Sequence, residues 1–581
     1  AGGQVPEYPR QELPDATKWD HTKWSPNYRN DNRIETHESG TAPCKTACPA
    51  HVAVQGYLKL AAQGRYDEAL ALIKRENPLP AICGRVCNRR CEDACTRGRV
   101  DAAVAIDEVK KFIAQRDLDA ATRYVPPVVT PTRAGGFDQK IAIIGAGPAG
   151  LSCAFYLAEK GYKPVVFEKN ERPGGMLTYG IPSFKLQKDV IEAEVEIIRL
   201  MGAEFRYGVE VGRDVTLDEL REQGFKAFYV AIGCQGGRLA GIPGEDAEDV
   251  TVAVDFLREV NSGKIDALPG RTIVVGGGNV AIDVARNACR LGSEHVEMFC
   301  LESETQMPAS EEERREAVED GAHISCGWGP KEVHLDEAGR VCGITFRRCT
   351  RVFDDEGRFA PEYDESDLRR VDADRVVMSI GQSIVWGDLL AGSKVELGHG
   401  QGALADPQTY QTAEPDIFVG GDVYTGPSFA IDAIAAGHEA AVSIHRFVQP
   451  GSTLTIGRNP RRYTALDRDD VVIESYDNAS REVAHVDRER EKAAPFSEYV
   501  ETFTEEQVRA ETARCLGCGA SIVDPNKCIG CGLCTTKCAF DAIHLDRDRP
   551  ECSTMVKYEQ KLPSLGKYAL KRAIKIKFGR K

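Results

Sequence analysis

The chain has 581 residues, which is long enough for about three or four domains with separate cores. Its net charge of −15 argues against general binding to nucleic acid, because a phosphate backbone requires a basic surface. No run of about 18 apolar residues occurs, and the first residues lack a basic start followed by an apolar segment. We therefore expect a cytoplasmic protein without a transmembrane segment.

Residues 1–42 are polar and charged without a helical or strand period, which predicts an extended arm. Residues 43–125 show a helical pattern and carry two groups of cysteines. Clustered cysteines in a large chain without an export signal indicate metal ligation rather than disulfides. The candidates here are Cys44, Cys48, Cys87, Cys91 and Cys95, together with Cys83; if the segment from Cys83 to Cys95 were one helix, its spacing of four would place the cysteines on one side.

From Lys140 the chain alternates short β-branched runs with helical segments, which predicts parallel sheets covered on both faces. The first run leads into "IGAGPAG", where Gly145, Gly147 and Gly150 allow a tight turn, close approach of a pyrophosphate, and tight packing of helix on strand. Glu168 ends the next strand, where an acid binds the ribose hydroxyls of a dinucleotide. We expect a first dinucleotide-binding domain in residues 137–260 and 383–447.

A second run, "TIVVGGGNVAID", repeats this pattern with Gly276, Gly278 and Ala281, inside residues 261–382. Glu302 follows the second strand of this unit, where we expect it to bind a ribose; a solvated strand end is the alternative. Later, "DIFVGGDVYTG" places Gly421 and Asp422 at a strand end before a helix of small residues.

Residues 448–504 form a charged connector, and residues 505–555 are predicted to be a ferredoxin-like 4Fe-4S module. Cys528, Cys531 and Cys534 have the Cys-x2-Cys-x2-Cys spacing that wraps one cubane, and Cys538 follows three residues later. Zinc more often uses two separated pairs of ligands. Residues 556–581 form a basic tail, in which Lys567, Lys571 and Lys575 share one helical face.

Residues 43–447 resemble the small subunit of glutamate synthase and the matching segment of dihydropyrimidine dehydrogenase. The segments "CPAHVAVQGYLKL", "NPLPAICGRVCNRRCEDAC", "RPGGMLTYGIPSFKL" and "MPASEEE" carry this resemblance. It implies a multidomain fold with an α-helical iron-sulfur domain, two nested Rossmann-like α/β domains and a C-terminal α+β ferredoxin-like module. It also implies FAD contacts at Gly145, Gly147, Pro148, Ala149, Gly150, Glu168, Gly175, Met176, Gly233, Gly421 and Asp422, and nicotinamide dinucleotide contacts at Gly276, Gly278, Asn279, Val280 and Glu302.

The family also carries two cubanes in the helical domain, with an early Cys-x2-Cys that this chain lacks before Cys44. One hypothesis is that Cys515 and Cys518 fold back to complete a cluster with Cys44 and Cys95, while Cys48, Cys87 and Cys91 hold another. The fourth ligand of that second cluster is open, because Lys110 occupies the position of a Gln or Glu in relatives; Glu108, Cys83 and Cys538 are candidates. The competing arrangement groups Cys515, Cys518, Cys538 and Cys552 with the Cys528 triple. With Cys83 left out, the candidate cysteines number twelve, enough for about three clusters.

The segment "GGMLTYGIPSFKL" has no cysteine, and Cys289 and Cys300 of the second unit are far apart in the sequence, which argues against a disulfide reductase. Iron-sulfur clusters are then the remaining acceptors for electrons from a flavin. We expect an NADH-linked FAD and iron-sulfur oxidoreductase that serves ferredoxin or a larger reductase subunit in a hetero-oligomer, with Glu302 favouring NAD(H) over NADP(H). A bifurcating transhydrogenase subunit and a non-catalytic cofactor-binding adaptor are the alternatives.

Overall fold

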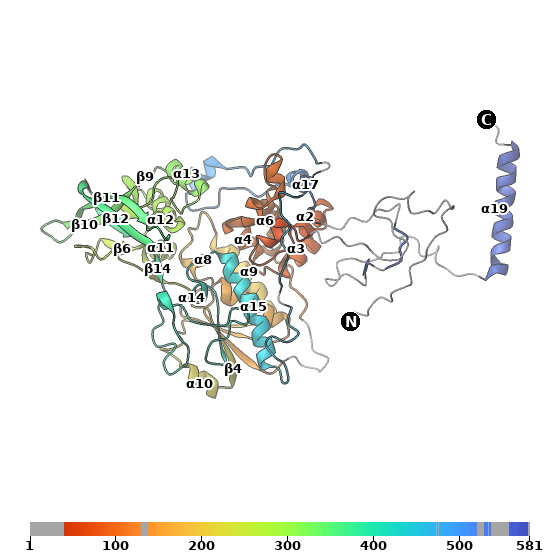
Figure 1. The fold of residues 1–581 in the computed structure, drawn as a ribbon, viewed down its shortest axis with the longest axis horizontal. Coiled ribbons are helices and arrows are strands. Elements are labelled where there is room, and N and C mark those ends of the chain that lie inside the picture. Colours follow the sequence, from red (N-terminus) through yellow and green to blue (C-terminus); the bar gives the residue numbers. More distant parts are fainter. Residues whose placement is uncertain are drawn as a thin grey trace. The chain divides into compact units, whose positions relative to one another are not determined.

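The computed structural model describes residues 40–128, 137–459, 461–471, 473, 476–519, 528–532, 534–535 and 557–578. The chain forms two compact units, one from Gly40 to Ala520 and another made of Ala1–Ser39 and Ser521–Lys581 (Figure 1). None of the described helices is both long and apolar enough to cross a bilayer.

The larger unit begins with a helical domain whose first helices pack around a shared apolar core. Proline at the first positions of two of these helices suits the missing backbone donor of a helix start. Gly84 allows α4 to approach α6, since a Cβ there would lie 2.8 Å from the Lys111 Cα. The helices are α1 (Pro43–Thr46), α2 (Val54–Ala62), α3 (Tyr66–Lys74), α4 (Pro80–Val86), α5 (Arg90–Asp93) and α6 (Ile106–Ala114).

The segment from Cys83 to Cys95 is not one helix. α4 ends at Val86, and Arg89 takes the left-handed conformation with φ of 53° before α5 begins. The spacing of four therefore does not place these cysteines on one helical side, and their grouping comes from the packing of separate helices instead.

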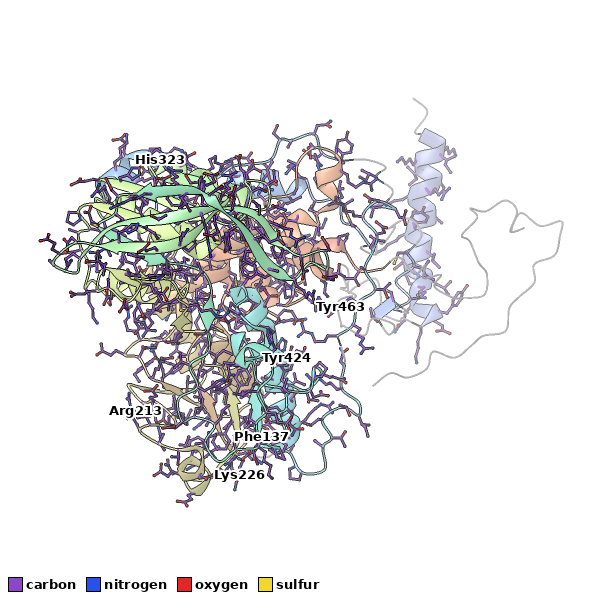
Figure 2. All side chains as sticks on the ribbon, turned by 60° about the vertical axis from the view of Figure 1, so that its left-hand side comes forward. Phe137, Arg213, Lys226, His323, Tyr424 and Tyr463 are labelled. Carbon is purple, nitrogen blue, oxygen red and sulfur yellow. The ribbon has the colours of Figure 1, made fainter. Side chains whose placement is uncertain are left out.

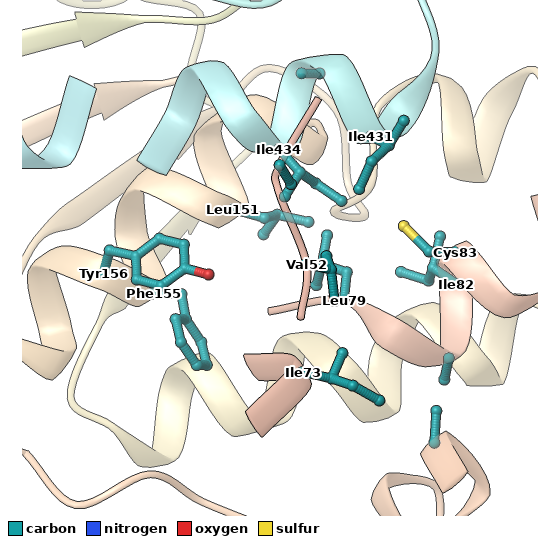
Figure 3. Packing of buried hydrophobic residues seen from close by; sticks show 14 of the residues in the cluster. Val52, Ile73, Leu79, Ile82, Cys83, Leu151, Phe155, Tyr156, Ile431 and Ile434 are labelled. Carbon is teal, nitrogen blue, oxygen red and sulfur yellow. The ribbon is translucent and has the colours of Figure 1, made fainter. Parts of the chain in front are cut away.

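A five-stranded sheet with parallel pairs follows, in the order β15-β4-β1-β2-β3. Helices α7 (Pro148–Glu159) and α15 (Ala430–Val448) cover one face, and their side chains merge with the core of the helical domain, as Figure 3 shows for Leu151, Ile434 and Ile82. The strands are β1 (Lys140–Ile144), β2 (Val165–Glu168), β3 (Glu204–Tyr207), β4 (Phe225–Val230) and β15 (Ile417–Val419), and α9 (Lys188–Leu200) and α10 (Leu217–Glu222) lie in this part of the chain.

A second five-stranded parallel sheet, in the order β6-β13-β7-β8-β9, is inserted between β4 and β15. His323 marks this sheet and Lys226 marks the first one in Figure 2. The strands of the second sheet are β6 (Val250–Val252), β7 (Arg271–Val275), β8 (His295–Cys300), β9 (His323–Cys326) and β13 (Arg375–Met378). The helices in this part of the chain are α11 (Ala253–Asn261), α12 (Asn279–Arg290) and α13 (Glu311–Glu319). The predicted pair of nested Rossmann-like sheets is confirmed.

Two smaller sheets accompany the second sheet. One contains three antiparallel strands, β10 (Trp328–Leu335), β11 (Val341–Phe353) and β12 (Phe359–Val371), and the other pairs β5 (Gly236–Gly237) with β14 (Gln382–Ser383). Beyond α15 the chain returns to the helical domain, where α17 (Glu505–Ala513) packs on α2 and α6. In the smaller unit, α19 (Tyr558–Phe578) is a 21-residue helix.

Candidate functional site

The first glycine turn has the geometry that close packing of a dinucleotide requires. Gly145 has φ of 104°, and a Cβ on Gly150 would lie 1.9 Å from the Gly145 carbonyl oxygen, so neither position accepts a side chain. A Cβ on Gly147 would meet nothing within 4 Å, which leaves the backbone there open to a ligand. The turn also opens α7, whose N-terminal end favours phosphate.

A cavity of about 220 Å³ begins at this turn. It brings together all the predicted FAD residues except Gly150, which instead packs under the turn. Sequence-distant parts of the lining are Glu168, Gly175 with Met176, Gly233, and Gly421 with Asp422.

Two carboxylates in this cavity are held in place by hydrogen bonds. Glu168 accepts from the Ala146 N–H at 2.8 Å and from the Asn170 N–H at 2.9 Å, and it is almost fully buried. Asp422 accepts from the Ser428 N–H at 3.2 Å, and burial raises the pKa of its carboxyl group. Both acids are therefore fixed acceptors at the carboxyl ends of strands, where dinucleotide hydroxyls bind in this fold.

The second glycine turn repeats these features. A Cβ on Gly276 would lie 2.2 Å from the Ser379 carbonyl oxygen, and Gly278 faces open space. The Glu302 carboxylate lies beside the turn, since its Oε2 would be 3.0 Å from a Cβ on Gly277. Asn279 accepts from the Ser310 N–H at 3.2 Å. Glu302 thus stands where its position in the sequence predicted, and its ribose contact stays a prediction.

Arg348 is a charged residue near this site that sequence reasoning missed. The Gly327 N–H donates to the Glu302 carbonyl oxygen at 2.9 Å, and the Arg348 guanidinium carbon would be 3.2 Å from a Cβ on Gly327. Arg348 comes from β11, where no local motif points to a dinucleotide. The antiparallel hairpin alone brings this cation near the end of β8.

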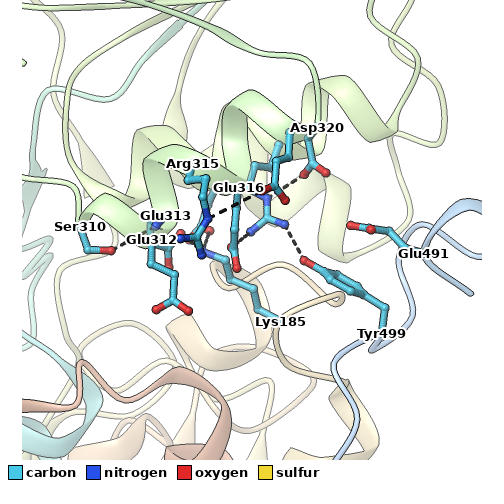
Figure 4. Close-up of polar contacts among 12 residues, drawn as sticks. Lys185, Ser310, Glu312, Glu313, Arg315, Glu316, Asp320, Glu491 and Tyr499 are labelled. Carbon is cyan, nitrogen blue, oxygen red and sulfur yellow. Dashed lines mark hydrogen bonds and ion pairs between the residues drawn. The ribbon is translucent and has the colours of Figure 1, made fainter. Parts of the chain in front are cut away.

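Lys185 joins the two dinucleotide-binding parts and was also missed. Its Nζ lies 2.6 Å from an Asp283 carboxylate oxygen in α12 and also pairs with Glu313 of α13 (Figure 4). Asp283 and Val280 line the first cavity, so the start of α12 faces the FAD-type pocket. Burial raises the pKa of Asp283 to about 6, while Lys185 acts against this shift.

The first and last parts of the Gly40–Ala520 unit meet at one set of cysteines. Cys44, Cys95, Cys515 and Cys518 line a small, mostly apolar cavity together with residues of α2. Burial raises the pKa of Cys44, and the charges of Cys515, Cys95 and Cys518 add to this rise. Four thiolates around an apolar cavity suit a cubane, in which each iron takes one thiolate. This grouping is the one that the fold-back hypothesis predicts.

A second set contains Cys48, Cys87 and Cys91 and lies against α6. Burial raises the pKa of Cys91, and its charged neighbours include Lys110, Asp107 and Cys87. Cys87 in turn has Cys48 among its neighbours. Among the residues that the structure describes, no three Cys, His, Asp or Glu side chains converge as the ligands of a single ion would.

The C-terminal cysteines belong to the smaller unit. Cys528, Cys531 and Cys534 are described, and Gly530 and Gly532 between them have positive φ, as a chain that turns around a cluster needs. Cys538 and Cys552 lie outside the described residues.

The first cavity and the second cysteine set are adjacent. Val86 lines the cavity, and the next residue, Cys87, belongs to the set. A residue of the cavity lining is therefore followed directly by a metal-ligand candidate.

Three family models match the chain. Residues 139–437 match pyridine nucleotide-disulphide oxidoreductases, residues 35–122 match dihydropyrimidine dehydrogenase domain II with its 4Fe-4S cluster, and residues 521–544 match a 4Fe-4S binding domain. These matches confirm the predicted kinship and 4Fe-4S binding near both ends of the chain.

Curated relatives agree with the family models. The NADP(+)-dependent formate dehydrogenase subunit beta of Moorella thermoacetica is 35% identical, over 82% of this chain and 70% of that protein. The glutamate synthase [NADPH] small chain of Escherichia coli K12 is 35% identical, over 71% of this chain and 89% of that protein. The NAD-dependent dihydropyrimidine dehydrogenase subunit PreT of Escherichia coli O157:H7 is 32% identical, over 70% and 91%.

Proposed function

We propose that this chain, which belongs to the pyridine nucleotide-disulphide oxidoreductase family, is an electron-transfer subunit that links NAD(H) through FAD and about three 4Fe-4S clusters to ferredoxin or a larger reductase subunit. The adjacency of Val86 in the large cavity and Cys87 in the second cysteine set carries this proposal. It offers a short route from a flavin to a cluster without a redox disulfide.

Each part of the chain has a distinct task in this proposal. The Gly145 turn, Glu168 and Asp422 hold FAD, and the Gly276 turn holds the nicotinamide dinucleotide. FAD, when bound, accepts a hydride and releases single electrons. The start of α12 reaches the same cavity through Val280 and Asp283, which supports delivery of a nicotinamide to the flavin. Cys44, Cys95, Cys515 and Cys518 hold one cluster, and the Cys528 triple holds another.

The preferred nicotinamide is NADH in this proposal. The Glu302 carboxylate beside the second turn accepts free ribose hydroxyls and repels a 2'-phosphate. Arg348 is the nearby cation that could oppose this preference. The names of the relatives given above include NAD as well as NADP(+) and NADPH. In this proposal the cofactor preference therefore depends on Glu302 and Arg348.

Steady-state reduction of a dye by each cofactor tests this preference. The native protein should favour NADH by roughly 30-fold to 1000-fold, the ratio that about 2 to 4 kcal/mol produces. A Leu301→Arg, Glu302→Arg double variant should shift toward NADPH, and Arg348→Ala should leave the NADH preference in place. A native preference for NADPH that Arg348→Ala removes would assign the specificity to Arg348 instead.

Two other functions make different predictions. A non-catalytic adaptor would bind both cofactors but show no bleaching of the flavin band when NADH is added under argon. A bifurcating transhydrogenase subunit would need a second flavin or a partner protein for coupled reduction of two acceptors. Direct reduction of ferredoxin by this chain with NADH alone, without a second acceptor, supports the simple electron-transfer role.

A further inference from the structure

Among the described residues, the second cysteine set contains three thiols and no fourth one in a ligand position; Cys538 lies outside those residues. Cys48, Cys87 and Cys91 supply three thiolates, and a cubane has four irons. Any fourth ligand must come from a side chain that faces the same space. The candidates on neighbouring elements are Cys83 of α4 and Asp107, Glu108 and Lys110 of α6.

Packing of α4 on α6 brings the first turns of α6 to the thiols. Gly84 packs against the Lys111 backbone, and the side chain of the preceding residue, Lys110, is buried. The Nζ atom of Lys110 pairs with a carboxylate oxygen of Asp107, and Cys87 and Cys83 are among its principal charged neighbours. A buried ammonium group thus faces the thiol set.

Cys83 and Glu108 fit the fourth position less well. Cys83 is packed in the apolar core, where Figure 3 shows it near Ile82 and Ile431. Its charged neighbours include Lys110 and Cys87, but unlike Asp107 it is not among the principal charged neighbours of Cys91. The charged neighbours of Glu108 are Lys111, Asp107, Arg89 and Glu92, with no cysteine among the principal ones.

Asp107 differs from both. Its side chain is 2% exposed, and its charge acts on Cys87, Cys91 and Tyr57. Its backbone N–H donates to Glu92 Oε1 at 2.8 Å, which fixes the start of α6. One carboxylate oxygen pairs with Lys110, and the other lies 3.9 Å from Arg89 Nε, which is too far for a direct hydrogen bond.

We propose that the Asp107 carboxylate is the fourth ligand of the cluster held by Cys48, Cys87 and Cys91, and that Lys110 positions it. This inference rests on the proposed function, because it assumes that a cluster occupies this set. One oxygen binds iron while the other keeps its ion pair with Lys110. A carboxylate carries the same charge as the thiolate it replaces, and the buried ammonium offsets one negative charge of the cluster. The cluster at Cys44 has no buried lysine among the principal charged neighbours of its thiols.

The test uses the full chain, reconstituted under argon with FAD, iron and sulfide. Asp107→Ala should lose one iron per flavin and, in the oxidised protein, show the electron paramagnetic resonance signal of a three-iron cluster. Asp107→Cys should keep all the iron, because it places a thiolate at the same corner, with a changed signal from this cluster alone. Glu108→Ala, the next residue in the same helical turn, is the matched control and should keep the native iron content.

Lys110→Gln separates positioning from ligation. It should retain all irons but move the reduction potential of this cluster downward, because it removes a neighbouring positive charge. Bound FAD per chain reports whether each variant has folded.

The proposal is overturned if folded Asp107→Ala keeps four irons at this set, or if Cys83→Ser or Lys110→Gln, and not Asp107→Ala, produces the three-iron signal. It is also overturned if the native protein shows iron at the Cys44 set but none at this one, a result that leaves the proposed electron-transfer role in place. Absence of flavin reduction by NADH, with this cluster intact, would instead contradict the proposed function.

Discussion

The guanidinium of Arg514 lies 3.0 Å from the Asp101 carboxylate, 413 residues away in the sequence. Arg514 is fully buried, and it also pairs with Glu511 at 2.6 Å and donates to the carbonyl oxygens of Ala102 and Ala103. Cys515 follows directly. This buried arginine therefore fastens the segment that carries Cys515 and Cys518 to the domain that carries Cys44 and Cys95.

Substitution of Arg514 should cause loss of the cluster that is held by Cys44, Cys95, Cys515 and Cys518. Arg514→Met leaves Glu511 buried without its cation, which costs about 3–5 kcal/mol for a broken buried pair. We expect iron per flavin to fall by about four, the content of one cubane. Arg509→Met is the matched control, because the Arg509–Glu505 pair is exposed and its loss should leave the iron content unchanged. Native iron content in Arg514→Met would contradict the role of this anchor.

FAD binding should depend on the absence of a side chain at Gly150. In Gly150→Ala the new Cβ would meet the Gly145 carbonyl oxygen at 1.9 Å, so the glycine turn must shift. We expect FAD per chain after gel filtration to fall more than tenfold, corresponding to over about 1.4 kcal/mol. Gly566→Ala is the control, since a Cβ there meets nothing within 4 Å. Normal FAD content in Gly150→Ala would show that the turn does not hold the cofactor.

Stability should fall as pH rises because of Glu194. This α9 residue accepts from the N–H groups of Ala81 at 2.7 Å and Ile82 at 3.0 Å, at the start of α4. Burial, aided by Asp117, raises the pKa of Glu194 to about 8, although both N–H groups and Lys74 act against this shift. The native state thus retains a proton that the unfolded state has released above its ordinary pKa of 4.5.

From about pH 5 to pH 8, Glu194 alone should therefore lower the free energy of unfolding by up to about 1.4 kcal/mol per pH unit. Thermal unfolding at several pH values measures this slope. Glu194→Gln keeps an acceptor and cannot ionise, so the slope should become shallower in this variant. Equal slopes in both proteins would mean that Glu194 is already ionised in the folded state.

The basic helix should dock an acidic partner. Lys567, Lys571 and Lys575 are exposed on α19, as are the apolar residues Leu570 and Ile574. Deletion of residues 565–581 should slow reduction of an acidic ferredoxin and weaken its dependence on salt, because charge steering acts mainly on association. Flavin bleaching by NADH should not change. If the deletion changes neither the rate of ferredoxin reduction nor its salt dependence, the basic tail does not dock the partner.

Local motifs predicted much of the fold and of the dinucleotide sites. Strand–turn–helix units of about 30 residues determine where the glycine turns, Glu168 and Glu302 lie. The spacing of these residues in the sequence therefore predicts their positions in the structure. The meeting of Cys44 with Cys518 was one of two alternatives, because spacing does not determine which distant cysteines meet.

Other site residues had no local signal. Arg348 reaches the second site only because β11 pairs with β10, and Lys185 meets Asp283 only because the segment before α9 lies beside α12. Cys300 and Cys326 are 26 residues apart in the sequence, yet they are register partners on β8 and β9 with sulfur atoms 3.7 Å apart. The break at Arg89 likewise depends on tertiary packing, which overrode the helical spacing of the cysteines.

The most direct test of the central claim is electron paramagnetic resonance of the full chain after one anaerobic addition of NADH. The account predicts that flavin bleaching is followed by signals of reduced 4Fe-4S clusters without any partner protein present. In Gly150→Ala, which should lack FAD, the same addition should leave the clusters oxidised, although dithionite still reduces them. Bleaching of the flavin with clusters that stay oxidised, yet accept electrons from dithionite and have potentials above that of NADH, would contradict the account.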